Sequence, residues 1–151
     1  MNETRLLSDH HEIQQLKYRY SYGANILDGK SGDLDMFSAL FSEDASFDVG
    51  MGEVIGPVQI KALMEQLTTQ WHCAMHYMLN PLIDVSGDAA TGQFTGLFGF
   101  TKTASSAPIW LSNIYTDTFV RTSDGWRFQS VRVRQAFADP AFLEGYADQI
   151  K

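Results

Sequence analysis

The first half of the chain carries apolar residues at the spacing of helices. Residues that recur at intervals of three and four predict a first helix: Ile13, Leu16, Tyr20, Ala24 and Leu27. Ser8 and Asp9 precede this stripe and are candidate N-caps. Residues 28–32, Asp-Gly-Lys-Ser-Gly, form a stop signal. We therefore expect a helix that ends at about Leu27.

Two shorter helices and one short strand are predicted next. Asp33 is a candidate cap for a second helix, and its apolar face is Leu34, Phe37, Leu40 and Phe41. Ala45–Val49 is typical of a strand, and residues 50–53 contain two glycines that suit a hairpin tip or a bulged edge. Pro57 suits the first position of a third helix, which we expect to run to about Trp71.

The second half of the chain changes to the pattern of long strands. Four are predicted: Met75–Val85, Ala89–Lys102, Pro108–Arg121 and Trp126–Ala138. Short polar turns connect them, which favours an antiparallel meander. Gly92, Gly96 and Gly99 lie inside the second of these strands and indicate that the sheet bends sharply.

Helices that precede strands favour an α+β fold over an alternating α/β fold. We expect one domain over residues 1–151, with a core at about residues 8–138 and a tail at residues 139–151 that forms a short terminal helix. The chain is 44% hydrophobic and 19% charged, which suits a packed core rather than extended disorder.

The charge balance narrows the possible partners. The formal net charge is −7, so the chain lacks the basic surface that nucleic acid or an anionic membrane would need. Cys73 is the single cysteine, and no leader pattern or long apolar run is evident. We expect a cytoplasmic protein whose partner is a small molecule.

Two residues stand out as candidate catalysts. Asp28 lies four residues after Ala24, so a helix continued to this point would place a carboxylate on its apolar stripe. His76 alternates with Met78 and Asn80 in the first long strand and shares their face. If that face looks inward, Asp28 can orient the imidazole of His76, whose other nitrogen then acts as a general base.

Simpler interpretations of the same residues remain open. Asp28 can merely terminate the first helix, and His76 can be a core histidine bonded to backbone. His72 and His76 are spaced for a helical metal site, but no acidic third ligand follows, so we predict no metal. His10 and His11 suit exposed positions, and Cys73 suits a small buried residue.

Several short strings, in this order and spacing, resemble one known superfamily. They are Ile13-Gln14-Gln15-Leu16 with Asp28 and Gly32-Asp33, residues 40–45 (Leu-Phe-Ser-Glu-Asp-Ala), Gly56, His76 with Asn80, residues 84–89 (Asp-Val-Ser-Gly-Asp-Ala), residues 115–117 (Tyr-Thr-Asp) and residues 124–128 (Asp-Gly-Trp-Arg-Phe). The match covers about residues 8–135 and resembles the SnoaL-like branch of the nuclear transport factor 2-like superfamily.

This resemblance implies a cone-shaped, curved and mostly antiparallel sheet wrapped around N-terminal helices, the cystatin-like α+β barrel. Members that include scytalone dehydratase, hexachlorocyclohexane dehydrochlorinase and bile-acid dehydratases lie in this superfamily. The dehydratase and dehydrochlorinase members use an Asp–His pair, which the resemblance assigns to Asp28 and His76. It also implies a reaction without a cofactor and a homodimer or homotrimer.

Other polar and aromatic residues are candidates for substrate binding. Asn113 and Tyr115 share one face of the third long strand with Asp117, where an amide and a phenol can hydrogen-bond a substrate oxygen. Arg132 can bind an anionic group or form a structural ion pair. Aromatic residues that suit a pocket for a flat ligand are Phe47, Trp71, Phe94, Phe98, Phe100 and Trp110.

We therefore expect a cofactor-independent lyase of the dehydratase kind, or an isomerase, that acts on a small hydrophobic cyclic substrate. Two alternatives are a non-catalytic protein that binds a small molecule in the same pocket and a structural subunit of a larger, oxygenase-type assembly.

Overall fold

The computed structural model describes residues 2–142. Three helices precede or interrupt the first strands: α1 (Glu3–Ala24), α2 (Leu34–Ser38) and α3 (Pro57–Thr68). Eight strands follow the order β1 (Ile26–Leu27), β2 (Lys30–Ser31), β3 (Phe41–Asp48), β4 (Val54–Ile55), β5 (Cys73–Ser86), β6 (Ala89–Thr101), β7 (Ile109–Thr122) and β8 (Gly125–Ala138). The four predicted long strands are β5–β8, each within two residues of its predicted ends.

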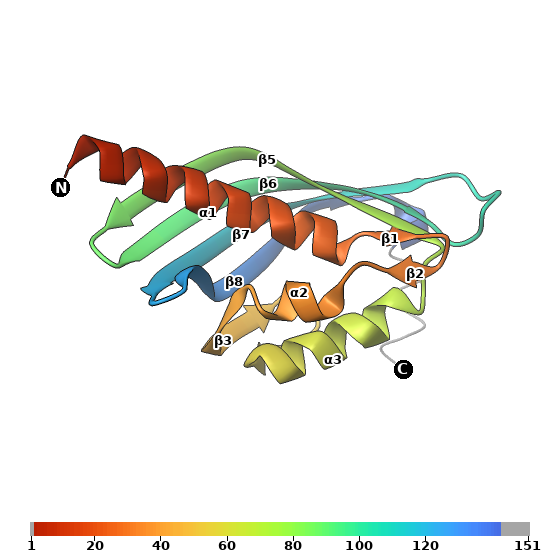
Figure 1. The fold of residues 1–151 in the computed structure, drawn as a ribbon. Helices are drawn as coiled ribbons and strands as arrows, with labels where there is room; N and C mark the ends of the chain where they lie inside the picture. The colour runs from red at the N-terminus through yellow and green to blue at the C-terminus, as the bar shows by residue number, and fades with distance from the viewer. Residues whose placement is uncertain (1, 143–151) are drawn as a thin grey trace.

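All eight strands form one curved sheet in the order β2-β1-β5-β6-β7-β8-β3-β4. The four long strands pair antiparallel with their neighbours, as the short turns between them predict. Helix α1 lies across one face of this sheet, while α2 and α3 lie beside it near β3 (Figure 1). The expected α+β fold with a curled, mostly antiparallel sheet and N-terminal helices is confirmed.

One strand pairing is parallel and was not predicted. β3 pairs with β8 through Phe47 and Val131, although the two strands lie far apart in the sequence. The register shifts between Phe41 and Ser46, so the pairing contains a bulge. A parallel partner needs a long connection rather than a hairpin, and local turn signals do not reveal it.

Helix α1 begins earlier than its apolar stripe suggested. The side chain of Asn2 caps it by accepting a hydrogen bond from the backbone N–H of Thr4 at 3.0 Å. Asp9, expected as a cap, instead lies inside the helix and is buried. Its carboxylate accepts hydrogen bonds from Arg121 at 2.6 Å and from the indole N–H of Trp126 at 3.1 Å. Asp9 thus fastens α1 to the turn between β7 and β8.

Helix α1 also ends earlier than expected. Its last residue is Ala24, and Asn25 has an extended ψ of 146°. Ile26 then pairs with Ala74 of β5, and Asp28 adopts a left-handed φ of 52° in the turn to β2. The helical stripe therefore stops before Asp28, and this change of direction decides where that carboxylate points.

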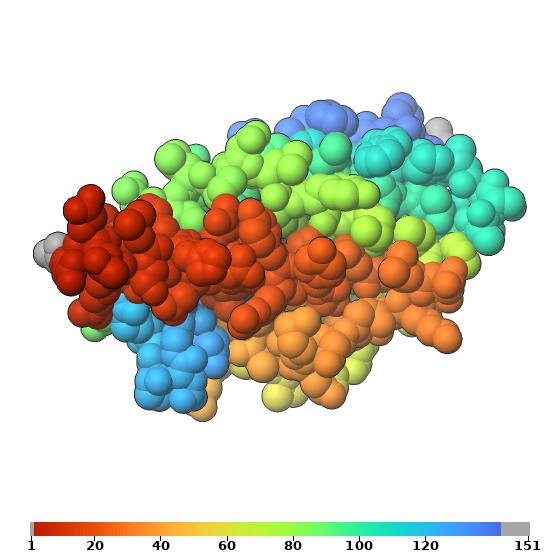
Figure 2. Space-filling model, turned by 45° about the horizontal axis from the view of Figure 1, so that its top comes forward, coloured from red at the N-terminus to blue at the C-terminus, as the bar shows by residue number. Residues whose placement is uncertain are grey.

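The apolar side of α1 packs into the concave face of the sheet. Its buried residues Ile13, Leu16, Tyr20 and Ala24 are those of the predicted stripe. In the space-filling view, α1 forms a continuous band with β5 and β6 on one side and the β7–β8 turn and α2 on the other (Figure 2). The core is thus the space between α1, the bent sheet and the shorter helices.

The predicted starts of the other two helices are confirmed. Asp33 accepts a hydrogen bond from the N–H of Met36 at 2.9 Å, and Pro57 is the first residue of α3. Residues 140–142 of the predicted terminal helix are helical, and residues 143–151, the rest of that prediction, lie outside the described part of the chain. Between residues 2 and 142, none of the helices is both long and apolar enough to cross a membrane.

Candidate functional site

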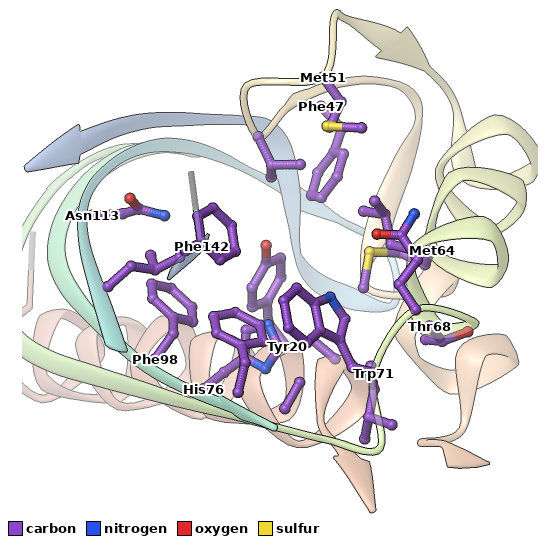
Figure 3. Close-up of a pocket in the computed structure, with 18 of the residues that line it drawn as sticks. Tyr20, Phe47, Met51, Met64, Thr68, Trp71, His76, Phe98, Asn113 and Phe142 are labelled. Carbon is purple, nitrogen blue, oxygen red and sulfur yellow. The ribbon is translucent and has the colours of Figure 1, made fainter. Parts of the chain in front are cut away.

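A cavity of about 170 Å³ opens between α1, α3 and the concave face of the sheet. Its walls are mostly apolar and include seven aromatic residues: Tyr20, Phe47, Trp71, Phe98, Phe100, Tyr115 and Phe142. Figure 3 shows these rings arranged around a common space, with His76 on the α1 side and Asn113 across from it. An apolar cavity with few polar groups is the usual form of a small-molecule site.

The imidazole of His76 is held by Asn25 at the end of α1. Asn25 Oδ1 accepts a hydrogen bond from the backbone N–H of His76 at 2.8 Å and lies 3.2 Å from the ring Nδ1. A backbone N–H can only donate, so the atom that faces both groups is the amide oxygen. The ring therefore carries its proton on Nδ1, and Nε2 keeps a lone pair that can accept a proton.

A second contact from α1 fixes the backbone of the same residue. Ser21, one helical turn before Asn25, donates its hydroxyl to the carbonyl oxygen of His76. Residues four apart on a helix lie on the same side, so Ser21 and Asn25 hold this point of β5 together. The ring contacts Phe98 and Phe100 edge-on, with ring centroids 5.0 and 6.2 Å away. His76 is thus preorganised before any ligand arrives.

The surroundings of His76 favour its neutral form. Burial among aromatic rings and, to a smaller extent, the nearby positive charge of Lys17 together lower the pKa of His76 to about 4, while a hydrogen bond to the backbone of Ala74 opposes the change. The amide of Asn25 orients the ring but brings no negative charge that would stabilise an imidazolium. At neutral pH, Nε2 is therefore an unprotonated acceptor throughout the population.

The structure does not bring Asp28 and His76 together as expected. The side chain of Asp28 is 91% exposed, and its carboxylate lies 3.7 Å from Nε2 of His72. The physical reason is the early end of α1, which turns Asp28 out of the helical stripe. Asn25, three residues earlier, occupies the position beside the imidazole that was assigned to the carboxylate.

Most of the predicted substrate-binding residues do share one cavity. Those that line it are Phe47, Trp71, Phe98, Phe100, Asn113 and Tyr115. Arg132 lies elsewhere and forms an ion pair with Glu53 near the tip of the β3–β4 hairpin. The cavity also takes in residues that the sequence pattern did not single out, among them Lys102 and Phe142.

A buried ion pair lies behind the aromatic wall. Lys17 Nζ is 2.7 Å from Asp117 Oδ2, and both side chains are 0% exposed. Lys17 was missed, although its place between Leu16 and Tyr20 on the apolar stripe is itself a signal that a partner is needed. Asp117 was expected to share a face with Tyr115, and that arrangement is found.

Aromatic rings enclose the ammonium group of Lys17. Its Nζ lies 3.7 Å from the ring centroid of Tyr115 and 4.3 Å from that of Tyr20. Burial lowers the pKa of Lys17 and raises the pKa of Asp117 to about 6, while the mutual attraction of the pair opposes both changes. Burial also raises the pKa of the Tyr115 phenol, which therefore stays protonated and can donate a hydrogen bond.

No metal site is evident in this region. Within residues 2–142, His, Cys, Asp and Glu side chains form no group of three that could hold an ion. His72 and His76, the pair considered for a metal, have separate partners in Asp28 and Asn25.

The curled sheet, the helix laid into it and the apolar cavity between them define a protein of the nuclear transport factor 2-like fold. A family model described as a SnoaL-like domain matches residues 5–132. The chain therefore belongs to the SnoaL-like family. A comparison with curated proteins found no match.

Solved structures show the same fold. A hexachlorocyclohexane dehydrochlorinase, LinA-type3, from Novosphingobium barchaimii is 22% identical, with a TM-score of 0.80 over 92% of this chain and 94% of that chain. A provisionally named scytalone dehydratase from Novosphingobium aromaticivorans is 24% identical, with a TM-score of 0.77 over 91% and 90% of the two chains.

A third match comes from the same organism as the second. This NTF2-like protein with a cystatin-like fold from Novosphingobium aromaticivorans is 27% identical, with a TM-score of 0.71 over 91% of this chain and 88% of that chain. These likenesses support the fold described above, which hosts dehydratases and dehydrochlorinases among other proteins.

Proposed function

We propose that the chain is a cofactor-independent lyase or isomerase that acts on a small hydrophobic cyclic substrate. The observation that carries this proposal is the imidazole of His76, which lines an apolar cavity in a fixed orientation with Nε2 as its unprotonated nitrogen. A dehydrochlorinase and a provisionally named dehydratase share the fold, which supports the same reaction class.

The chemistry begins with removal of a proton from carbon. Nε2 of His76 accepts a proton from a C–H bond next to a substrate carbonyl, and the electron pair of that bond moves toward the carbonyl oxygen. A base of low pKa is weak, so the carbonyl must be polarised for this step to proceed. An aspartate base with a pKa near 5 is known to work beside strong hydrogen-bond donors, as in ketosteroid isomerase.

Asn113 and Tyr115 are the candidate donors to that oxygen. Both line the cavity from β7, where the ring of Tyr115 also contacts Lys17 of α1. The neutral phenol of Tyr115 donates a hydrogen bond that strengthens as negative charge develops on the substrate oxygen. The amide of Asn113 offers a further donor to the same region.

The proton taken by His76 completes either reaction. In an isomerisation it returns to another carbon of the substrate. In a dehydration it goes to the hydroxyl group on the neighbouring carbon, the C–O bond breaks, and the products are an alkene and water. An imidazolium whose pKa is about 4 is a strong acid for its kind, which favours the delivery of this proton to a leaving hydroxyl.

The test is a ligand screen followed by isotope exchange. Cyclic ketones and hydroxyketones are screened by thermal shift, and the hits are incubated in D₂O while NMR follows exchange of the protons next to the carbonyl and loss of the hydroxyl group. We expect exchange or elimination with wild type and a loss of at least about 100-fold in His76→Gln. His72→Gln is the matched control, because His72 lies four residues earlier and outside the cavity lining.

Two outcomes separate catalysis from binding. If His76→Gln exchanges substrate protons as fast as wild type, His76 is not the base and the proposal is wrong. If ligands bind but neither exchange nor elimination occurs, the chain is the non-catalytic binding protein. The second function is favoured by one observation, namely that an amide rather than a carboxylate contacts the imidazole.

The quaternary structure is a separate proposal. A homodimer or homotrimer is expected from the resemblance, and a single chain is described here. Large apolar residues that the structure exposes on the long strands are Tyr77, Leu79, Leu82, Trp110 and Phe137. Sedimentation velocity of wild type and of Tyr77→Ser tests whether copies associate through this part of the sheet.

A further inference from the structure

Phe142, the last described residue, forms part of the cavity wall. Its ring stacks on Trp71 with an interplanar angle of 5° and a centroid distance of 6.0 Å, and it lies 5.6 Å from the ring of Phe100. Both of those residues belong to the cavity lining. The segment that follows the last strand therefore returns to the cavity and contributes a ring to it (Figure 3).

The position of this ring is fixed by hydrogen bonds at the end of β8. The N–H of Asp139 donates to the carbonyl oxygen of Trp110 at 2.8 Å, which ties the segment to the start of β7. Asp139 then accepts from Ala141 N–H through its carboxylate and from Phe142 N–H through its carbonyl, each at 2.9 Å. This turn aims the side chain of Phe142 toward Trp71 rather than toward solvent.

The size of the cavity gives this arrangement a consequence. The space is about 170 Å³, close to the engineered apolar cavity of about 150 Å³ that binds benzene. By this comparison, the space suits one six-membered ring with small substituents. Among residues 2–142, Phe142 is the one ring of the wall contributed from beyond the last strand, whereas Phe98 and Phe100 are embedded in β6.

We propose that Phe142 is a specificity-determining residue that limits the ligand to a single ring, and that the natural ligand is accordingly monocyclic. The proposal rests on the proposed function in one respect, namely that the same cavity takes the substrate. Replacing the phenyl group by hydrogen frees the volume of about one ring without touching His76, Asn25 or the oxygen-binding residues of β7.

The experiment compares one-ring and two-ring probes. Dissociation constants of phenol, cyclohexanone, 2-naphthol and 2-decalone are measured by calorimetry for wild type, Phe142→Ala and Phe142→Trp. We expect wild type to prefer the one-ring probes, and Phe142→Ala to bind the two-ring probes about tenfold more tightly than wild type does. Phe142→Trp fills more of the cavity and should weaken the binding of the one-ring probes.

Phe137→Ala is the matched control. It removes the same phenyl group from the neighbouring strand β8, where Phe137 is 57% exposed and does not line the cavity. It should leave all four dissociation constants within twofold of wild type. Melting temperatures of the three variants establish that each is folded at the temperature of measurement.

The outcomes of this binding experiment can be distinguished from the outcomes of the isotope-exchange experiment that tests the proposed function. Equal affinity of wild type and Phe142→Ala for the two-ring probes would overturn the size limit, and so would a Phe142→Ala variant that binds none of the probes. The readout is binding, so a wild type that binds phenol but exchanges no protons contradicts the proposed chemistry and leaves the role of Phe142 in place.

Discussion

Asn25 accepts hydrogen bonds from both the backbone and the ring of His76, so the side chain that orients the imidazole is an amide. An amide fixes the tautomer as well as a carboxylate does, but it adds no charge. The imidazole therefore keeps a low pKa, and its conjugate acid is correspondingly strong. This combination determines how the proposed reaction should respond to pH.

The first prediction concerns the pH profile. The pKa of His76 is lowered to about 4, so the neutral base that the proposed reaction needs is fully present at neutral pH. We expect kcat/KM to stay constant from about pH 5.5 to 8 and to fall about tenfold per unit below pH 4. NMR titration of the His76 ring proton should give the same midpoint, and a midpoint above 6 would contradict the structure.

The same lowered pKa predicts a change of stability with pH. An unfolded chain binds a proton to this histidine below its ordinary pKa near 6.5, whereas the folded chain does so only near 4. The contribution of His76 to the free energy of unfolding is therefore intact above about pH 6.5 and lost as the pH falls toward 4. Urea unfolding of wild type and His76→Gln at pH 7 and 4.5 measures it, and the variant should lose less stability between the two.

A further prediction concerns substitutions of Asn25, the residue that contacts the imidazole. Asn25→Asp places a carboxylate against Nδ1, which stabilises the imidazolium and should raise the pKa of His76 by about one to three units. The acid limb of the activity profile should move up by the same amount. Asn25→Leu removes the acceptor for Nδ1 and should reduce activity while leaving the pKa low. If Asn25→Asp leaves the titration midpoint unchanged, the contact is not made in solution.

The buried pair of Lys17 and Asp117 predicts a strongly non-additive pair of substitutions. Lys17→Met leaves an unpaired buried carboxylate, and we expect a loss of about 3–5 kcal/mol in the free energy of unfolding. Lys17→Met combined with Asp117→Leu removes both charges and replaces the carboxyl group by a branched apolar end. This double variant should be within about 2 kcal/mol of wild type or more stable. Urea unfolding of wild type, Lys17→Met, Asp117→Leu and the double variant measures the coupling, and additive effects would contradict it.

The close packing around Gly96 predicts that the cavity wall does not tolerate a larger residue at this position. A Cβ at this position of β6 would lie 2.6 Å from the ring of Phe98 and 2.9 Å from that of Tyr115. Gly96→Ala should therefore push these rings toward the cavity, with a loss of about 1–3 kcal/mol in stability and weaker ligand binding. Gly99→Ala, whose Cβ would meet Trp110 at 3.1 Å, is the milder control. Equal effects of the two substitutions on ligand binding would contradict the steric role assigned to Gly96 in the cavity wall.

Much of the fold could be predicted from local signals. The turns that contain Gly87 and Gly125 delimit β5–β8, and Asp33 and Pro57 mark the starts of α2 and α3. These features depend on a few adjacent residues, which is why the sequence reveals them. The parallel pairing of β3 with β8 depends on residues far apart in the chain and has no such signal.

The candidate site was predicted only in part, and the reason lies at the end of α1. His76 was located from strand alternation, which the structure preserves, whereas the six aromatic candidates were chosen by residue type, and Phe94 and Trp110 do not line the cavity. Asp28 was placed by extending the helical period past Ala24, where the backbone has already become extended. The pairing of Ile26 with Ala74 fixes the end of α1, and such a tertiary contact has no local sequence signal. Because α1 ends there, Asn25 rather than Asp28 contacts the imidazole of His76.

The parallel contact between β3 and β8 also bears on how the chain is made. β3 is synthesised before the four long strands, yet the strand that covers its edge, β8, follows all of the other strands described in the sheet. Until then its edge and the aromatic side chains beside it have no native cover, a state in which unpaired strands tend to aggregate. A nascent chain of this protein should therefore need a chaperone, or fast translation of its second half, more than its modest length suggests.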